Sequence, residues 1–203
     1  MNIVEIQPID LNNMKRLFYF LSYIYTWPLY VYFKVALKFQ NNQALYFKSD
    51  LSKRKEKFFE LMFYQTMYRN LFYKRFKPYA APLKIICPPE DSFSIDGNVD
   101  IGEGLFLMHP YRTIVHAKSI GNNVSLFHNI TIGANVGTDK LPIIGNNVTI
   151  FTGAVVVGGV IIGDNSIIGA NSVITKDVPA NCTVVGNPAY IIKNNGKCCN
   201  IKL

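Results

Sequence analysis

The second half of the chain places an apolar residue at every sixth position. The series runs Ile95, Ile101, Leu107, then after a one-residue slip Ile114, Ile120, Leu126, Ile132, and finally Ile144, Ile150, Val156, Ile162, Ile168 and Ile174. Only Thr138 breaks it. An α-helix repeats every 3.6 residues and simple strand alternation every two, so neither produces a six-residue period with glycine at a fixed phase. Each hexad therefore predicts one short strand and one turn.

Three hexads close one triangular coil of 18 residues, and stacked coils bury a column of Ile and Val that no single coil buries alone. The pattern predicts a parallel β-helix over residues 91–193. An ordinary β-sandwich is the alternative. Eight hexads in one register favour the β-helix.

Residues 1–90 have a different pattern, which predicts helices. Residues 17–33 carry nine aromatic side chains and no charge, but this run contains Pro28 and is shorter than the ~20 residues of a membrane-spanning helix. A further helix is predicted to begin at Ser49 or Asp50 and to end near Lys77. Because periodic apolar faces usually pack, we favour core and subunit contacts for these stretches over membrane contact.

Charge divides the chain at the same place. Residues 1–90 hold 14 Lys or Arg and 6 Asp or Glu, whereas residues 91–203 hold 7 of each, so the whole net charge of +8 lies in the first part. This part is expected to be an oligomerisation or membrane-proximal region, with peripheral contact to an anionic inner membrane face as one option. No nucleic-acid-binding motif accompanies the basic residues. Residues 194–203 are expected to form a tail.

The cysteines and the start of the chain favour a cytoplasmic location. Four cysteines, of which Cys198 and Cys199 are adjacent, do not make the spaced framework of a small secreted protein. The first ten residues contain two acidic residues and no basic one, unlike a secretory signal.

Three histidines are the candidates for acid–base chemistry. His109 and His128 both stand two places after an inward residue, so they are predicted to lie on one face of adjacent coils. His116 heads a second predicted column, continued at 18-residue intervals by Ala134, Thr152 and Ala170. Small side chains in a row leave a smooth strip for a slender ligand arm. The paired spacing of a three-histidine metal site is absent, so no metal is expected.

Two segments carry a resemblance to a known family. LFLMHPYRTIVHAKSIGNNVSLFHNITIG and TKDVPANCTVVGNPA resemble the serine acetyltransferase branch of the hexapeptide acyltransferases, including its capsular polysaccharide O-acetyltransferase relatives. The match covers roughly residues 89–193. It implies an α+β protein in which an N-terminal helical region precedes a left-handed parallel β-helix. It also implies a homotrimer or a dimer of trimers, with acetyl-CoA in the groove between two prisms.

The resemblance also assigns roles to residues. His109 matches the catalytic histidine, which would act as general base toward an acceptor hydroxyl. Ala134, Thr152 and Ala170 match the wall positions that meet the pantetheine arm of acetyl-CoA. Lys176 and Lys193 are expected phosphate partners by charge and location.

The acceptor side departs from the serine-specific members. Met108 stands where they have Asp before the catalytic histidine, and Leu141 stands where they have a second histidine. With Tyr111 and His128, these residues are the expected acceptor contacts. Two apolar residues cannot hold a zwitterion, so the sequence favours O-acetylation of a sugar or polysaccharide hydroxyl. Serine O-acetylation is the alternative, and a non-catalytic hexapeptide scaffold is a third hypothesis.

Overall fold

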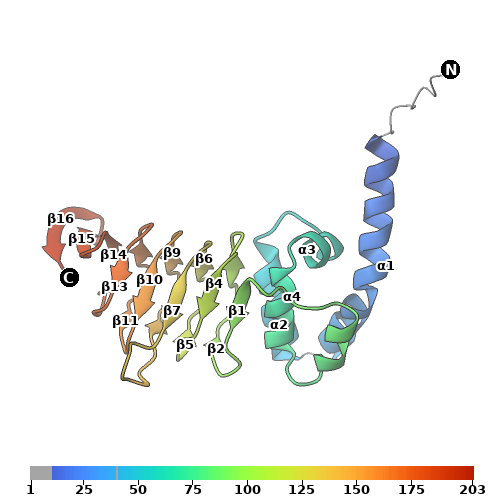
Figure 1. Cartoon of the computed structure of the whole chain (residues 1–203), viewed down its shortest axis with the longest axis horizontal. Helices are drawn as coiled ribbons and strands as arrows, with labels where there is room; N and C mark the ends of the chain where they lie inside the picture. Colours follow the sequence, from blue (N-terminus) through green and yellow to red (C-terminus); the bar gives the residue numbers. More distant parts are fainter. Residues whose placement is uncertain (1–10, 40) are drawn as a thin grey trace, which may run out of the picture.

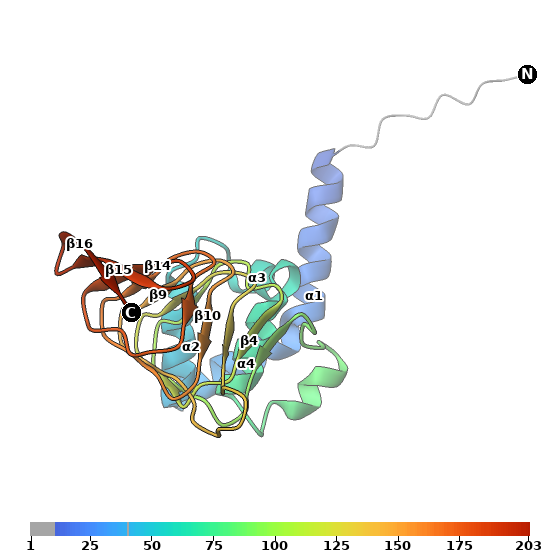
Figure 2. The ribbon, with the colours of Figure 1, turned by 60° about the vertical axis from the view of Figure 1, so that its left-hand side comes forward.

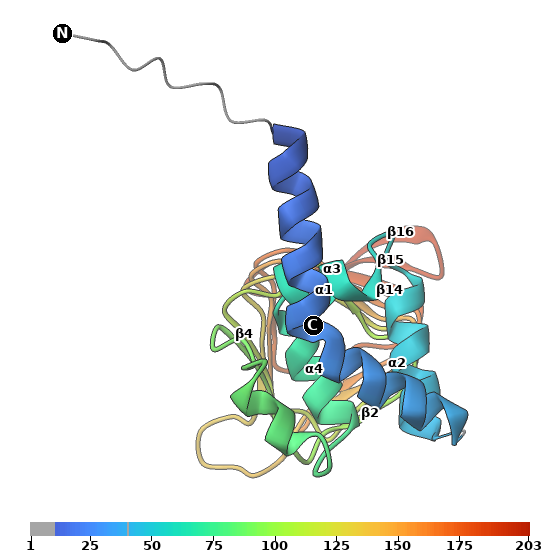
Figure 3. The same cartoon turned by 90° about the vertical axis from the view of Figure 1, so that its right-hand side faces the viewer.

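The computed structural model describes residues 11–39 and 41–203 as a group of helices followed by a prism of short strands (Figure 1). The helices are α1 (Leu11–Lys38), α2 (Asn42–Ser52), α3 (Phe58–Tyr64), α4 (Met67–Arg75) and the 3₁₀ helix η1 (Ala81–Ile85). Seen from the helical end, they lie across the first coil of the prism, while the first turns of α1 extend beyond it (Figure 3). The predicted α+β fold, helices followed by a left-handed parallel β-helix, is confirmed.

The prism has three walls, each a sheet of stacked strands from successive coils (Figure 2). The first sheet contains β1 (Phe93–Ile95), β4 (Thr113–Val115), β7 (Thr131–Gly133), β10 (Val155–Val157) and β13 (Val173–Ile174). The second contains β2 (Asp100–Ile101), β5 (Ser119–Ile120), β8 (Ile143–Ile144) and β11 (Ile161–Ile162). The third contains β3 (Phe106–Leu107), β6 (Ser125–Leu126), β9 (Thr149–Ile150), β12 (Ile167–Ile168) and β14 (Cys182–Val185). All these strands pair in parallel.

The hexad residues fill the interior, with one exception. From Leu107 to Ile174 the predicted inward residues are at most 2 % exposed, apart from Ile114. Ile114 was predicted to point inward and is 54 % exposed, and Val115 is buried in its place. Val115 pairs with Ile132 of the inward column. The next inward residue after Leu107 therefore lies eight positions along the chain, whereas the sequence pattern indicated seven. This spacing is two residues longer than a regular hexad.

The corner between the second and third sheets explains a glycine, followed by asparagine or aspartate, that recurs in three successive coils. The Asn146 side chain accepts the N–H of Asn122, and the Asp164 side chain accepts the N–H of Asn146. A Cβ on Gly145 would collide with the Asp164 carboxylate, so this stacking requires glycine there. The hydrogen bonds among Asn122, Asn146 and Asp164 therefore hold adjacent coils together.

The helical region differs from the prediction at its second helix. We predicted one helix from Ser49 or Asp50 to about Lys77, whereas α2 begins at Asn42, capped by the Asn41 side chain, and ends at Ser52. Two further helices, α3 and α4, follow. Asp50 caps no helix, because its carboxylate is buried and binds Arg75 through Nε at 3.0 Å and Nη2 at 3.1 Å.

This ion pair joins the helices to the prism. Asp50 also accepts the N–H of Leu105 at 2.8 Å, and Arg75 donates to the carbonyls of Ile101 and Gly102. Burial raises the pKa of Asp50 to about 6, although Arg75 beside it favours the charged form. One buried core is continuous from Leu29 in α1 to Ile191 near the other end of the prism.

The far end of the prism is closed by antiparallel strands. β15 (Tyr190–Asn194) pairs with β14, and β16 (Lys197–Lys202) pairs with β15. Most of residues 194–203, expected as a tail, therefore belong to the third sheet, and Cys198 and Cys199 lie in β16.

Candidate active site

His109 lies in a corner of the prism that is two residues longer than its equivalents. Five residues separate Leu107 from Thr113, whereas three separate Leu126 from Ile130 in the next coil. We term residues 108–112 the bulged corner. It joins the third sheet to the first. The two extra residues shift the side chains of this corner away from the column formed by the equivalent corners of other coils. Irregularities of this kind are often found next to active sites.

Backbone hydrogen bonds show which residues stack along this edge. Asn129 N–H donates to the Tyr111 carbonyl, and Gly153 N–H donates to the His128 carbonyl, at 2.8 and 3.1 Å. Thr152 and Ala170 continue the ladder, because Ile150 and Ile168 pair directly. The corner column is therefore Tyr111, His128, Thr152 and Ala170. His109 lies in the bulge, at the same edge as His128 but outside its ladder.

The bulged corner presents polar side chains to solvent. His109, Tyr111 and Arg112 are exposed, while Pro110 is buried and anchors the segment. Tyr111 N–H bonds to the His109 carbonyl at 2.7 Å, which reverses the chain tightly. His109 has φ of +50°, an uncommon conformation for a non-glycine residue and one found often at functional sites.

Tyr68 of α4 supports the strand that leads to His109. β3 is the outermost strand of the third sheet, so the N–H and C=O of Leu107 lack a strand partner on one side. The Tyr68 hydroxyl contacts both groups at 3.3 Å. Burial raises the pKa of Tyr68 to about 12, so this hydroxyl keeps its proton at neutral pH and can donate it. Tyr68 thus completes the edge of β3 two residues before His109.

The predicted column of His116, Ala134, Thr152 and Ala170 is wrong. His116 follows β4 and Ala134 follows β7, at the corner between the first and second sheets. Thr152 lies on the other edge of the first sheet, where its Oγ1 is 3.3 Å from Nδ1 of His128. Counting 18 residues per coil failed because the loop of residues 134–142 lengthens one coil to 24 residues, from Leu126 to Ile150.

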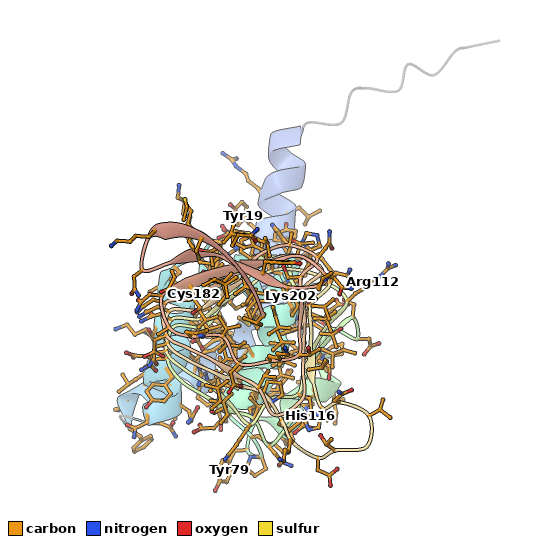
Figure 4. The ribbon with its side chains drawn as sticks, turned by 90° about the vertical axis from the view of Figure 1, so that its left-hand side faces the viewer. Tyr19, Tyr79, Arg112, His116, Cys182 and Lys202 are labelled. Carbon is orange, nitrogen blue, oxygen red and sulfur yellow. The ribbon has the colours of Figure 1, made fainter. Side chains whose placement is uncertain are left out.

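The candidate acceptor residues are divided between these two edges. Met108 is half-buried in the bulged corner, whereas Leu141 lies half-buried in the loop at the other edge. Leu141 lines an open groove of about 380 Å³ with Lys118, Lys140 and Gly159. His116, on that same edge, has its Nε2 4.0 Å from the Asp96 carboxylate. Figure 4, a view along the prism, shows Arg112 and His116 at separate corners. The candidate acceptor residues of one chain therefore lie at two separate edges of the first sheet.

The two lysines expected to bind phosphate lie on different walls. Lys176 follows β13 of the first sheet, and its Nζ donates to the Leu203 carbonyl at 3.2 Å. Lys193 is exposed in β15 of the third sheet, opposite Thr183. Within residues 11–39 and 41–203, no group of three His, Cys, Asp or Glu is placed to hold a metal ion.

Comparisons with known proteins agree with the prism. A family model described as bacterial transferase hexapeptide (six repeats) matches residues 142–176. These residues span β8 to β13, so this part of the β-helix is similar to the hexapeptide-repeat transferases. A serine acetyltransferase of Buchnera aphidicola is 40 % identical over 107 residues, which are 50 % of this chain and 41 % of that protein. The chain thus spans about two fifths of this relative's length.

Solved structures extend the likeness into the helical region. Serine acetyltransferase from Brucella abortus strain S19 is 25 % identical, with a TM-score of 0.62, over 79 % of this chain and 71 % of that one. The same enzyme in complex with coenzyme A aligns with a TM-score of 0.63 at 24 % identity, over 82 % and 72 % of the two chains. These proteins are named for serine, so the narrower resemblance to the capsular polysaccharide branch has no support from them.

Proposed function

We propose that this chain is an acetyl-CoA-dependent O-acetyltransferase with His109 as its general base. The observation that carries the proposal is the exposed histidine on a lengthened corner of a hexapeptide prism. The similarity to serine acetyltransferases, one of them solved with coenzyme A, supports acetyl-CoA as the donor.

In this mechanism His109 takes the proton of an acceptor hydroxyl while the hydroxyl oxygen attacks the thioester carbonyl of acetyl-CoA. A histidine is suited to this step because its ordinary pKa lies near neutrality, whereas an alcohol alone is a poor nucleophile. A backbone N–H would stabilise the oxyanion. Collapse of the tetrahedral intermediate breaks the carbon–sulfur bond, and the thiolate of CoA receives the proton from His109. No acyl-enzyme is required.

We further propose that the complete site forms between two chains. His109 and the corner column lie on one edge of the first sheet, while Ala134 and Leu141 lie on the other. A ligand touching both sets within one chain would have to cross an entire wall. In a trimer, one edge of each prism faces the opposite edge of its neighbour, so the pantetheine arm of acetyl-CoA would lie between Thr152 and Ala170 of one chain and Ala134 of the next. Lys176 and Lys193 remain the proposed phosphate partners.

Mixed oligomers test this arrangement. His109→Ala and a variant that blocks the opposite edge, Ala134→Trp, should each be inactive alone. Mixing them after unfolding and refolding should restore part of the activity, because some interfaces then combine two unaltered edges. Activity that is never restored, or a stable monomer that still turns over acetyl-CoA, would contradict a shared site.

L-serine and a carbohydrate hydroxyl are the two proposed acceptors. The names of the relatives favour serine. Met108 and Leu141 favour a carbohydrate, because neither side chain can pair with the ammonium or carboxylate of a free amino acid, and unpaired charges at a site are costly. Thiol release measured side by side with serine, nucleotide sugars and isolated polysaccharide decides between them. Release with any of these acceptors excludes a non-catalytic scaffold.

For the cellular location we propose the cytoplasm, with α1 in reversible contact with an anionic membrane. Among the described residues, no helix has the length and apolar character to cross a bilayer. α1 nevertheless exposes Phe20, Ile24, Trp27 and Val31, each at least 40 % accessible, although Trp27 also contacts Phe59 of α3. The α1 sequence contains four Lys or Arg and no Asp or Glu. This combination matches a negatively charged interface better than a second copy of the same helix.

A further inference from the structure

Arg112 occupies a backbone position that the other coils fill with asparagine or glycine. The ladder at this edge aligns Arg112 with Asn129, Gly153 and Asn171. All four residues have a left-handed backbone conformation, with φ of +53°, +57°, +74° and +55°. Asparagine and glycine adopt this conformation readily, whereas other side chains collide with their own backbone. An arginine is the costly choice at this point of the prism.

Among the described residues, no ion pair uses the side chain of Arg112. Its side chain is exposed and projects outward from the corner (Figure 4). Within the part of the chain that the structure describes, the ion pairs are Arg54–Glu56, Arg75–Asp50 and His116–Asp96, and Arg112 joins none of them. An arginine in an unfavourable backbone conformation that makes no ion pair within the described part of its own chain is a candidate for binding a ligand.

Arg112 also lies within reach of the chemistry assigned to His109. Three peptide units separate the two residues, so their Cα atoms are at most about 11 Å apart, and the turn from His109 to Tyr111 shortens that separation. One acceptor molecule is therefore long enough to reach both the guanidinium of Arg112 and the imidazole of His109.

The charge of this edge is simple. Arg112 is the only Lys, Arg, Asp or Glu among residues 107–113, 126–130, 150–154 and 168–172, which form the edge over four coils. One guanidinium fork matches one carboxylate with two parallel hydrogen bonds. A phosphate dianion normally recruits more than one cation, and this edge of the chain itself offers no acidic side chain to the ammonium of an amino acid.

We propose that Arg112 is a specificity residue that binds a carboxylate on the acceptor, so that the enzyme favours carboxylated acceptors such as a uronic acid. This inference rests on the proposed function and narrows its acceptor class. Arg112 could bind the carboxylate of serine or of a uronic acid, so it narrows the acceptor to a carboxylated molecule and does not by itself choose between the two.

The test compares acidic and neutral acceptors of the same shape. Thiol release from acetyl-CoA is measured with methyl glucuronide against methyl glucoside, and with L-serine against L-serinamide. For the unaltered protein, we expect kcat/KM for at least one acid to exceed that for its neutral partner by about 10- to 100-fold. Arg112→Asn should bring this ratio close to one while leaving the KM for acetyl-CoA unchanged.

Two further variants separate recognition from folding. Arg112→Asn installs the residue that the ladder uses elsewhere, so its Tm should equal or exceed that of the parent protein. Arg112→Lys keeps the charge without the fork and should recover part of the preference. Lys197→Gln, which removes one positive charge from β16 at the far end of the prism, is the matched control and should change nothing.

The possible results have distinct meanings. Turnover in which Arg112→Asn keeps the acid-to-neutral ratio, or in which the parent protein shows no such ratio, would overturn the role of Arg112 and leave the acetyltransferase intact. A raised KM for acetyl-CoA would also overturn it, because Arg112 would then bind a CoA phosphate. Absence of CoA release with every acceptor would instead contradict the proposed function itself.

Discussion

Replacing Asp50 with alanine should destabilise the protein strongly, because Asp50 is the centre of a buried ionic contact between helices and prism. The substitution removes both carboxylate bonds to Arg75 and the bond to Leu105 N–H. It leaves the Arg75 side chain, which is 2 % exposed, without its counter-ion. Breaking such a pair costs about 3–5 kcal/mol. At roughly 2–4 °C per kcal/mol for a protein of this size, Tm should fall by about 6–20 °C.

The loss should also depend on pH in a defined direction. Because burial raises the pKa of Asp50 to about 6, above its ordinary value of 3.8, the folded protein holds a proton that the unfolded chain releases. The stabilisation that the folded state gains from holding this proton on Asp50 is complete below about pH 4. It is lost as the pH rises through 6, where the folded protein also releases the proton. The difference in unfolding free energy between the parent protein and Asp50→Ala should therefore be larger at pH 5 than at pH 7.

Denaturant unfolding at the two pH values measures both effects. Asp91→Ala, at an exposed acidic position just before the prism, is the matched control and should stay within about 0.5 kcal/mol of the parent. A change below about 1 kcal/mol in Asp50→Ala, or a larger loss at pH 7 than at pH 5, would refute the reasoning about this contact.

Two other predictions concern the support of the site and the outer face of α1. Tyr68→Phe should lower Tm by several degrees and reduce kcat several-fold with little change in KM, because β3 loses the hydroxyl that holds its edge beside His109. Tyr73→Phe, which breaks a buried hydroxyl bond to the Cys87 carbonyl elsewhere, should lower Tm alone, and equal kcat losses would exclude a positioning role for Tyr68. Vesicles with anionic lipid should bind the protein in a salt-sensitive manner that Trp27→Glu abolishes; binding that persists in high salt would contradict peripheral contact.

The prism could be predicted from the sequence because each hexad carries its own signal. The inward Ile and Val, the corner glycine and the asparagine all recur at a fixed phase, so each coil repeats the evidence of the one before. The prediction for Ile114 is wrong because the pattern shows one extra residue between Leu107 and Ile120 and does not show its position. The two extra residues of the bulged corner and the shorter connection from Val115 to Ile120 leave a net slip of one, and only the strand pairing separates them.

The bounds of the helices and the residues of the corner column are set by contacts between residues distant in sequence. Asp50 is a favourable cap residue by type, but Arg75 and Leu105 use its carboxylate inside the core. The column was misassigned because a surface loop changes the length of one coil without disturbing the sheets on either side. The importance of Arg112 could not be read from the residue alone. Its alignment with Asn129, Gly153 and Asn171 becomes visible only from the ladder of backbone hydrogen bonds.

The central claim is that His109 is the base of an acetyl transfer, and steady-state thiol release by His109→Ala and His128→Ala tests it most directly. We expect His109→Ala to keep the Tm and the affinity for CoA of the parent protein while kcat falls by ~10²–10⁴. His128→Ala loses a side chain that contacts Thr152 and should reduce kcat much less. Equal losses in the two variants, or a His109→Ala protein that turns over acetyl-CoA at the parent rate, would contradict the account.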